Sequence, residues 1–165
     1  GGGGDARVVL DLSCGSGFMT RRLVKAGQFH RVIAGDYSET MLTETRRRLI
    51  EEGLKKRMPD LIRCDAAQLP FSTGTLDAIH VGAAFHTYPN LQESLCEIYR
   101  TLKPGGKLYA STSRRPSYID GPQSDERIFF TGHELSILLA RAGFDPYQVI
   151  IRPEGSGCLI VKCTK

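Results

Sequence analysis

Short apolar runs alternate with amphipathic segments along almost the whole chain, and this alternation restricts the possible folds most strongly. The first run, residues 7–11 (RVVLD), has the nearly continuous apolar character of a parallel strand covered on both faces. Residues 18–26 then show helical spacing and are followed by Gly27, a common residue at the end of a helix. Strands that alternate with helices predict a parallel sheet between two layers of helices.

The rest of the chain continues this pattern, so we expect an α/β fold with a doubly wound, Rossmann-like sheet of seven strands. The segment Lys103-Pro-Gly-Gly106 is expected to end a helix, and the polar residues 113–130 to form a loop. The last two strands predict a hairpin, which adds an antiparallel strand at the C-terminus to a mostly parallel sheet. Further strands are expected at residues 30–36, 60–65, 76–85, 107–112, 147–152 and 158–163, and further helices after Ser38, from Leu91 and after Thr131.

Size and composition predict a single domain over residues 5–165, with residues 1–4, all glycine, as a linker or trimming remnant. The chain of 165 residues is 41% hydrophobic and 24% charged, as in ordinary globular proteins. No apolar run has the length of a membrane span, so none is expected. A net charge of +4 is too small to indicate a nucleic-acid partner. Nothing in the sequence indicates an oligomeric state.

The cysteines favour a reducing compartment. They are five in number, widely scattered, and contain no C-x-x-C pair. This pattern predicts neither a zinc site, nor any other metal site, nor a disulfide framework.

Three acidic residues follow strand-like runs, and a glycine turn follows the first of them in the stretch VLDLSCGSGF. Asp11, Asp36 and Asp65 would all lie at the carboxyl ends of strands, where sheets of this kind bind ligands. Asp36 comes about 20 residues after the glycine turn, the spacing at which a carboxylate binds the ribose hydroxyls of an adenosine cofactor.

The turn itself indicates which adenosine cofactor is expected. The third glycine of a dinucleotide-binding G-x-G-x-x-G motif is replaced by Thr20, and no Walker lysine follows. S-adenosylmethionine fits better, because its carboxylate suits the first N–H groups of a helix and its ammonium and sulfonium groups suit Asp11. A nicotinamide-dependent oxidoreductase stays open as an alternative.

Four motifs in order resemble class I S-adenosylmethionine-dependent methyltransferases, over residues 7–163. They are DLSCGSG (11–17), GDYSETML (35–42), CDAAQLPF (64–71) and LKPGGKL (102–108). The chain most resembles the ubiquinone/menaquinone-biosynthesis-like group (methyltransferase type 11). Within that group, SCGSGFMTRR (13–22) and GAAFHTYPN (82–90) resemble uncharacterised plastid methyltransferases of plants and algae.

The resemblance implies a role for each matching residue. Asp11, Gly15 and Gly17 would line the methionine end of the cofactor, and Asp36 would hold the ribose. Ser13 stands where the family usually has glycine, which implies a less open turn.

The adenine end would involve a second set of residues. The resemblance implies that Tyr37 packs on the adenine face, Asp65 accepts from the adenine amino group, the Ala66 backbone reaches a ring nitrogen and Leu69 covers the ring. Met41 is a further candidate for adenine contact. For Tyr37 and Met41 a plain core position is an equal alternative.

Two side chains after the fourth strand are candidate catalytic residues. His86 could act as a general base near neutral pH, with Tyr88 close by, although a structural histidine is at least as good an interpretation. His80 alternates with apolar residues and is expected to pack inside the strand. Arg114 and Arg115 either meet an acidic group of a substrate or lie on a surface loop.

A basic run lies in the second helix and after it, at residues 46–48 and 55–57, and RNA binding is one interpretation of it. Because Glu44, Glu51 and Glu52 are interleaved with it, a solvated helix face is the preferred interpretation.

The sequence therefore predicts methyl transfer from S-adenosylmethionine to a small-molecule acceptor, with S-adenosylhomocysteine as the product. The resemblance suggests an aromatic, quinone-like or lipid-like acceptor, and a plastid protein if the narrower resemblance holds, otherwise a cytoplasmic one. A second alternative is a cofactor-binding core without turnover, because family members carry helices before the first strand that cover the substrate.

Overall fold

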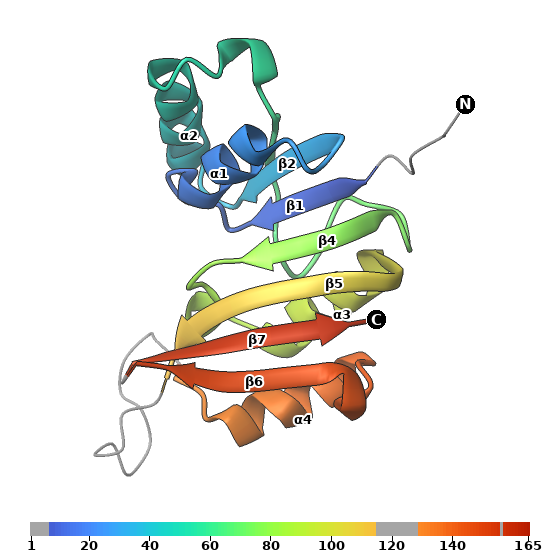
Figure 1. The fold of residues 1–165 in the computed structure, drawn as a ribbon. Helices are drawn as coiled ribbons and strands as arrows, with labels where there is room; N and C mark the ends of the chain where they lie inside the picture. Colours follow the sequence, from blue (N-terminus) through green and yellow to red (C-terminus); the bar gives the residue numbers. More distant parts are fainter. Residues whose placement is uncertain (1–6, 115–128, 156) are drawn as a thin grey trace.

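The computed structural model describes residues 7–114, 129–155 and 157–165 (Figure 1). The glycines at positions 1–4 and most of the predicted loop, residues 115–128, lie outside the described residues. The strands are β1 (Val8–Leu12), β2 (Arg31–Asp36), β3 (Asp60–Arg63), β4 (Leu76–Val81), β5 (Leu102–Ser113), β6 (Val149–Glu154) and β7 (Cys158–Thr164). The helices are α1 (Phe18–Ala26), α2 (Glu39–Glu51), α3 (Leu91–Thr101) and α4 (Gly132–Ala142), with short 3-10 turns η1 (Lys55–Arg57), η2 (Phe85–Thr87) and η3 (Pro146–Gln148).

The seven strands form one sheet in the order β3-β2-β1-β4-β5-β7-β6 (Figure 1). Strands β1 to β5 pair in parallel, and β7 is antiparallel to both of its neighbours, β5 and β6. The predicted doubly wound, mostly parallel sheet with an antiparallel C-terminal strand is confirmed.

Local signals explain where the helices begin and end. Helix α1 lies between Gly17 and Gly27, both with left-handed backbones, and therefore has the predicted bounds. The Ser38 hydroxyl accepts from the Met41 N–H at the start of α2. Thr131 and Glu134 form a reciprocal capping box at the start of α4.

Two predicted boundaries are wrong. The fourth strand ends at Val81 instead of residue 85, and Phe85 belongs to η2. The segment from Lys103 to Gly106 does not separate a helix from a later strand: α3 runs directly into β5. The pairing of β4 with β5 shifts register there, so the proline and glycines sit in an irregular part of the strand.

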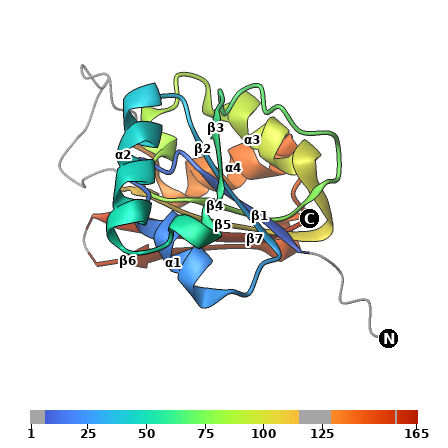
Figure 2. The same cartoon turned by 90° about the horizontal axis from the view of Figure 1, so that it is seen from above.

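Helices α3 and α4 cover one face of the sheet, while α1 and α2 cover part of the other (Figures 1 and 2). The main core lies under α3 and α4 and includes Leu95, Ile98 and Leu135, all fully buried. A smaller core joins Val24 of α1 and Leu49 of α2. Among the described residues, no helix lies over β5, β7 and β6 on the α1 side (Figure 1).

No helix in the described part of the chain is long and apolar enough to cross a membrane.

Replacing Thr131 by alanine should lower the free energy of unfolding by about 1 kcal/mol, because it removes the side-chain half of the capping box of α4. Thr131→Ser keeps the hydroxyl and should stay close to the original stability. Chemical denaturation of both variants measures the difference, and equal losses in both would contradict a capping role.

Candidate functional site

Strands β1 and β4 are neighbours in the sheet. The chain continues from β1 to β2 on one side and from β4 to β5 on the other, so strand order reverses between β1 and β4. Ligands of doubly wound sheets bind at the carboxyl ends of the strands beside such a reversal. Two hydrogen bonds join the segments that end there: Gly15 N–H donates to Asp36 Oδ2 at 2.8 Å, and the hydroxyls of Ser13 and Tyr88 are 2.7 Å apart. The turn after β1, the end of β2 and the segment after β4 therefore meet at one edge.

The turn after β1 depends on left-handed backbone at three positions. Ser13, Gly15 and Gly17 have φ angles of 57°, 55° and 76°. A Cβ at Gly15 would have no other atom within 4 Å, so open space adjoins this backbone. A Cβ at Gly17 would lie only 2.6 Å from Thr45 Cγ2. Gly15 therefore leaves room outside the turn, whereas Gly17 allows α2 to pack against it.

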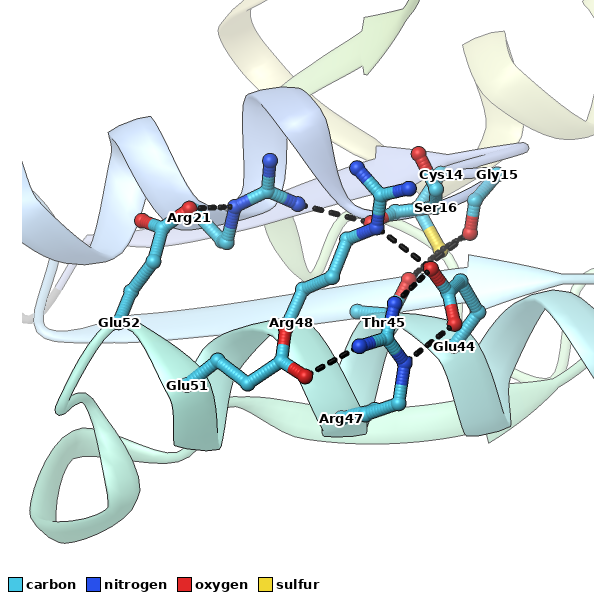
Figure 3. Close-up of polar contacts among 10 residues, drawn as sticks. All are labelled: Cys14, Gly15, Ser16, Arg21, Glu44, Thr45, Arg47, Arg48, Glu51 and Glu52. Atoms are coloured by element: carbon cyan, nitrogen blue, oxygen red, sulfur yellow. Dashed lines mark hydrogen bonds and ion pairs between the residues drawn. The ribbon is translucent and has the colours of Figure 1, made fainter.

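Side chains of α1 and α2 hold the turn from behind (Figure 3). The Thr45 hydroxyl donates to the Gly15 carbonyl at 2.8 Å. Arg21 donates to the Ser16 carbonyl at 2.8 Å and pairs with Glu52 at 2.6 Å. At the N-terminus of α1, Gly17 is the capping residue, and the first N–H groups of the helix have no side-chain cap.

The residues predicted for the ribose and adenine lie beside this turn. Asp36 is half-buried, and its two oxygens accept from the N–H groups of Gly15 and Ser38. Tyr37 is 68% exposed, so it is not a core residue, and Arg63 lies over its ring. Met41 is half-buried.

At the end of β3, Asp65 is exposed, while Ala66 and Leu69 are buried. Asp65 Oδ1 accepts from the Ala67 N–H at 2.9 Å, which fixes a turn directly after the strand. Three of the five residues predicted for the adenine end, Asp65, Ala66 and Leu69, therefore lie within one short segment directly after β3.

Asp11 is a buried residue of β1 whose carboxylate has partners within the protein. Its side chain is buried, with 1% of the residue exposed, and both oxygens are engaged. The Thr20 hydroxyl donates to Oδ2 at 2.5 Å, and His80 Nδ1 lies 2.8 Å from Oδ1. Asp11 therefore lies beneath the turn. His80 was expected only to pack inside the strand, but it is a hydrogen-bond partner of Asp11.

The two candidate catalytic side chains have geometries that favour structural roles. Tyr88 is 9% exposed, and its hydroxyl is hydrogen-bonded to that of Ser13. Burial raises the pKa of the Tyr88 hydroxyl above its ordinary value. His86 Nδ1 accepts from the Ser113 N–H at 3.4 Å and lies 3.2 Å from the Thr112 hydroxyl. That nitrogen therefore faces β5.

Two of the three arginines at residues 46–48 pair with glutamates of α2, and residues 46 and 47 are exposed, as predicted for a solvated face. Glu44 binds both Arg47 and Arg48, and Arg47 also binds Glu51 (Figure 3). Arg114 follows the carboxyl end of β5 and lines a cavity of about 370 Å³ together with apolar residues of β6. Arg115 lies outside the described residues.

Two glycine variants test the packing of the turn. Gly17→Ala should lower the free energy of unfolding by about 3 kcal/mol, because left-handed backbone costs about 1–2 kcal/mol and the new methyl group clashes with Thr45. Gly15→Ala should cost only about 1–2 kcal/mol, because its methyl group meets open space. Urea denaturation measures both, and equal losses would contradict the proposed close packing.

Thiol labelling tests the burial of the site. Burial, with the carboxylates of Asp11 and Asp36, raises the pKa of the Cys14 thiol to about 12. Burial raises that of Cys64 to about 11. Between pH 7 and 9 both thiols stay protonated, so iodoacetamide should label the exposed Cys96 well before either. Peptide mass spectrometry follows the order, and early labelling of Cys14 would contradict it.

Comparison with known proteins places this geometry in a family. Residues 10–110 match the family model described as a methyltransferase domain. An uncharacterised chloroplastic methyltransferase of Arabidopsis thaliana is 42% identical over 118 residues, which cover 70% of this chain and 32% of that protein. A demethylmenaquinone methyltransferase of Lactococcus lactis is 34% identical over 110 residues, 66% of this chain and 43% of that protein. The chain thus spans less than half the length of these relatives.

The solved structures agree with the sequence comparison. A SAM dependent methyltransferase from Aquifex aeolicus superposes with a TM-score of 0.78 and 25% identity, over 96% of this chain and 82% of that one. These matches decide against the nicotinamide-dependent oxidoreductase that the sequence left open. With the family model covering more than half of its residues, this chain belongs to the methyltransferase domain family.

Proposed function

We propose that the chain binds S-adenosylmethionine at the edge formed by the β1 turn and the end of β2, and transfers its methyl group to a small-molecule acceptor. The observation that carries the proposal is the Asp36 carboxylate, which is bonded to the glycine turn at 2.8 Å and half-buried beside it. An acid and a glycine turn in this arrangement suit an adenosine cofactor whose ribose carries no pyrophosphate.

The residues present fit this cofactor. Each oxygen of Asp36 accepts one backbone N–H, and an ionised carboxylate has acceptor capacity left for ribose hydroxyls. The N-terminus of α1 has no side-chain cap, so its N–H groups suit the methionine carboxylate. Tyr37 offers an exposed ring, and Asp65 an exposed carboxylate, for the adenine.

The cofactor supplies a methyl group on a positively charged sulfur and is converted to S-adenosylhomocysteine. The contribution of the chain is to hold a nucleophile in line with that methyl group. Such positioning is worth effective molarities of about 10⁵ M or more. We assign Tyr88 to positioning, because its bond to Ser13 fixes the turn, and its raised pKa makes it a poor base at neutral pH.

The names of the relatives support a proposal for the acceptor, because they include demethylmenaquinone methyltransferases and a ubiquinone/menaquinone biosynthesis C-methyltransferase. We propose a small aromatic acceptor of the quinone or hydroxyquinone type. The chloroplastic naming of two Arabidopsis relatives supports a plastid protein, and bacterial relatives match as well.

A cofactor-binding core without turnover is the second candidate. The sheet face on the α1 side, over which the described residues place no helix across β5, β7 and β6, favours it (Figure 1). Methyl transfer to a demethylated quinone by the 165-residue chain would decide for the enzyme. Cofactor binding without transfer would decide for the core.

Asp36→Asn should weaken binding of S-adenosylhomocysteine about tenfold or more, because it replaces a charged acceptor of the ribose hydroxyls by a neutral amide. Asp60→Asn is the matched control: it removes an acid from the start of β3, at the opposite edge, where Asp60 pairs with Arg31. Isothermal titration calorimetry measures both. Equal affinity in Asp36→Asn and the unmodified chain would remove Asp36 from the site.

A further inference from the structure

Two side chains of α3, Glu97 and Arg100, bind the backbone of the segment that connects β3 to β4. The Leu69 N–H donates to Glu97 Oε2 at 2.7 Å, and the Leu69 carbonyl accepts from the Arg100 guanidinium at 3.1 Å. The same guanidinium donates to the Phe71 carbonyl at 2.8 Å. Both backbone polar groups of Leu69 are therefore bonded to one ion pair of a helix that follows much later in the chain.

The geometry of the ion pair orients the guanidinium. Arg100 donates through Nε to Glu97 Oε1 at 2.7 Å and through Nη2 to Glu97 Oε2 at 2.8 Å. This two-point contact fixes the plane of the guanidinium as well as its position. The side chains of Glu97 and Arg100 are 20% and 35% exposed, so solvent screens the pair less than a fully exposed one. The remaining N–H groups of Arg100 consequently point in fixed directions, toward the two carbonyls.

The segment that the pair binds depends on such contacts, because it forms neither a helix nor a regular strand. Residues 64–75 contain turns, bends and one isolated bridge, between Asp65 and Gln68. Backbone polar groups outside regular structure need partners elsewhere. Leu69 follows the bridge directly, and its side chain is buried in the main core. Core packing and the α3 ion pair together hold this residue in place.

Hydrogen bonds connect this fixed point to the carboxylate proposed for the adenine. Gln68, next to Leu69, donates its N–H to the Asp65 carbonyl at 3.0 Å. At the other end of the turn, the Cys64 N–H donates to the Asp36 carbonyl at 3.0 Å. The turn is thus held at Cys64 by β2 and at Leu69 by α3, and the exposed Asp65 lies between these two points.

We propose that Glu97 and Arg100 are positioning residues that set the preference of this chain for adenine over other bases. This inference rests on the proposed function. The exocyclic amino group of adenine is a donor that suits the Asp65 carboxylate, whereas hypoxanthine has an acceptor carbonyl in its place. The carboxylate discriminates between the two bases only while its turn keeps it within hydrogen-bond distance. The ion pair of α3 acts on the base through that turn.

Calorimetry with S-adenosylhomocysteine and its deaminated analogue, S-inosylhomocysteine, tests this. The unmodified chain should bind S-adenosylhomocysteine about tenfold or more tightly, because the analogue lacks the donor for Asp65. Arg100→Ala removes both carbonyl contacts and should narrow this ratio about threefold or more, by weakening S-adenosylhomocysteine. Arg100→Lys keeps a cation but cannot donate in two fixed directions, and should restore part of the ratio.

Arg47→Ala is the matched control. Arg47 also pairs with a glutamate three residues away, Glu44, and with Glu51, and all three residues belong to α2. Its removal should leave the ratio of the two affinities as it is in the unmodified chain. Circular dichroism shows whether each variant is folded.

Glu97→Gln provides a second variant if Arg100→Ala folds poorly. It keeps an oxygen acceptor for the Leu69 N–H but loses the carboxylate that orients Arg100, so it should also narrow the ratio. Equal affinities of the two ligands in the unmodified chain, or equal weakening of both in the folded variant, would overturn the inference. Absence of binding of both ligands to the unmodified chain would instead overturn the proposed function.

Discussion

The Asp36 carboxylate joins the turn after β1 to the start of α2 by accepting two backbone N–H groups, from Gly15 and Ser38. Both donors belong to segments that would otherwise leave the sheet independently. Hydrogen bonds to a charged acceptor are worth about 1.5–3 kcal/mol, so this side chain contributes to the shape of the edge as well as to its charge. The glycine turn is consequently in place before any ligand arrives, which lowers the cost of ordering it on binding.

Packing behind the turn matters more than the ion pairs around it. The contact of Gly17 with Thr45 is buried, and a single added methyl group has no room there. The ion pairs of Arg47 and Arg48 on α2 are mostly exposed, and exposed pairs usually contribute about 0–1 kcal/mol. Arg21 is the exception, because it is largely buried and links the Ser16 carbonyl to Glu52.

Sequence patterns predicted the elements whose signals are local. Helix α1 was bounded correctly because a left-handed glycine flanks each end, and α4 because Thr131 caps it. The extension of β5 through Lys103–Gly106 was missed, since proline and glycine ordinarily end an element, whereas here pairing with β4 continues across a register shift.

The polar partners within the site could not be read from single segments. Asp11 and His80 become neighbours only through the register of β1 with β4, and Ser13 and Tyr88 only through the folding of the segment after β4. The alternation of His80 with apolar residues carried a weak signal: aligning the two predicted strands would have placed it beside Asp11. For Ser13, the sequence showed an unusual residue. It showed neither the left-handed backbone of Ser13 nor the hydrogen bond between its hydroxyl and that of Tyr88.

The central claim is that one adenosine-containing ligand binds at the edge shared by β1, β2 and β3. A ¹⁵N-labelled sample titrated with S-adenosylhomocysteine and followed by amide chemical shifts tests it residue by residue. We expect the largest shifts at Gly15, Gly17, Ser38 and Ala67, with Arg31 and Asp60 at the opposite edge unchanged. Saturable binding whose shifts concentrate at Arg31 and Asp60, and leave Gly15 and Gly17 unmoved, would contradict it.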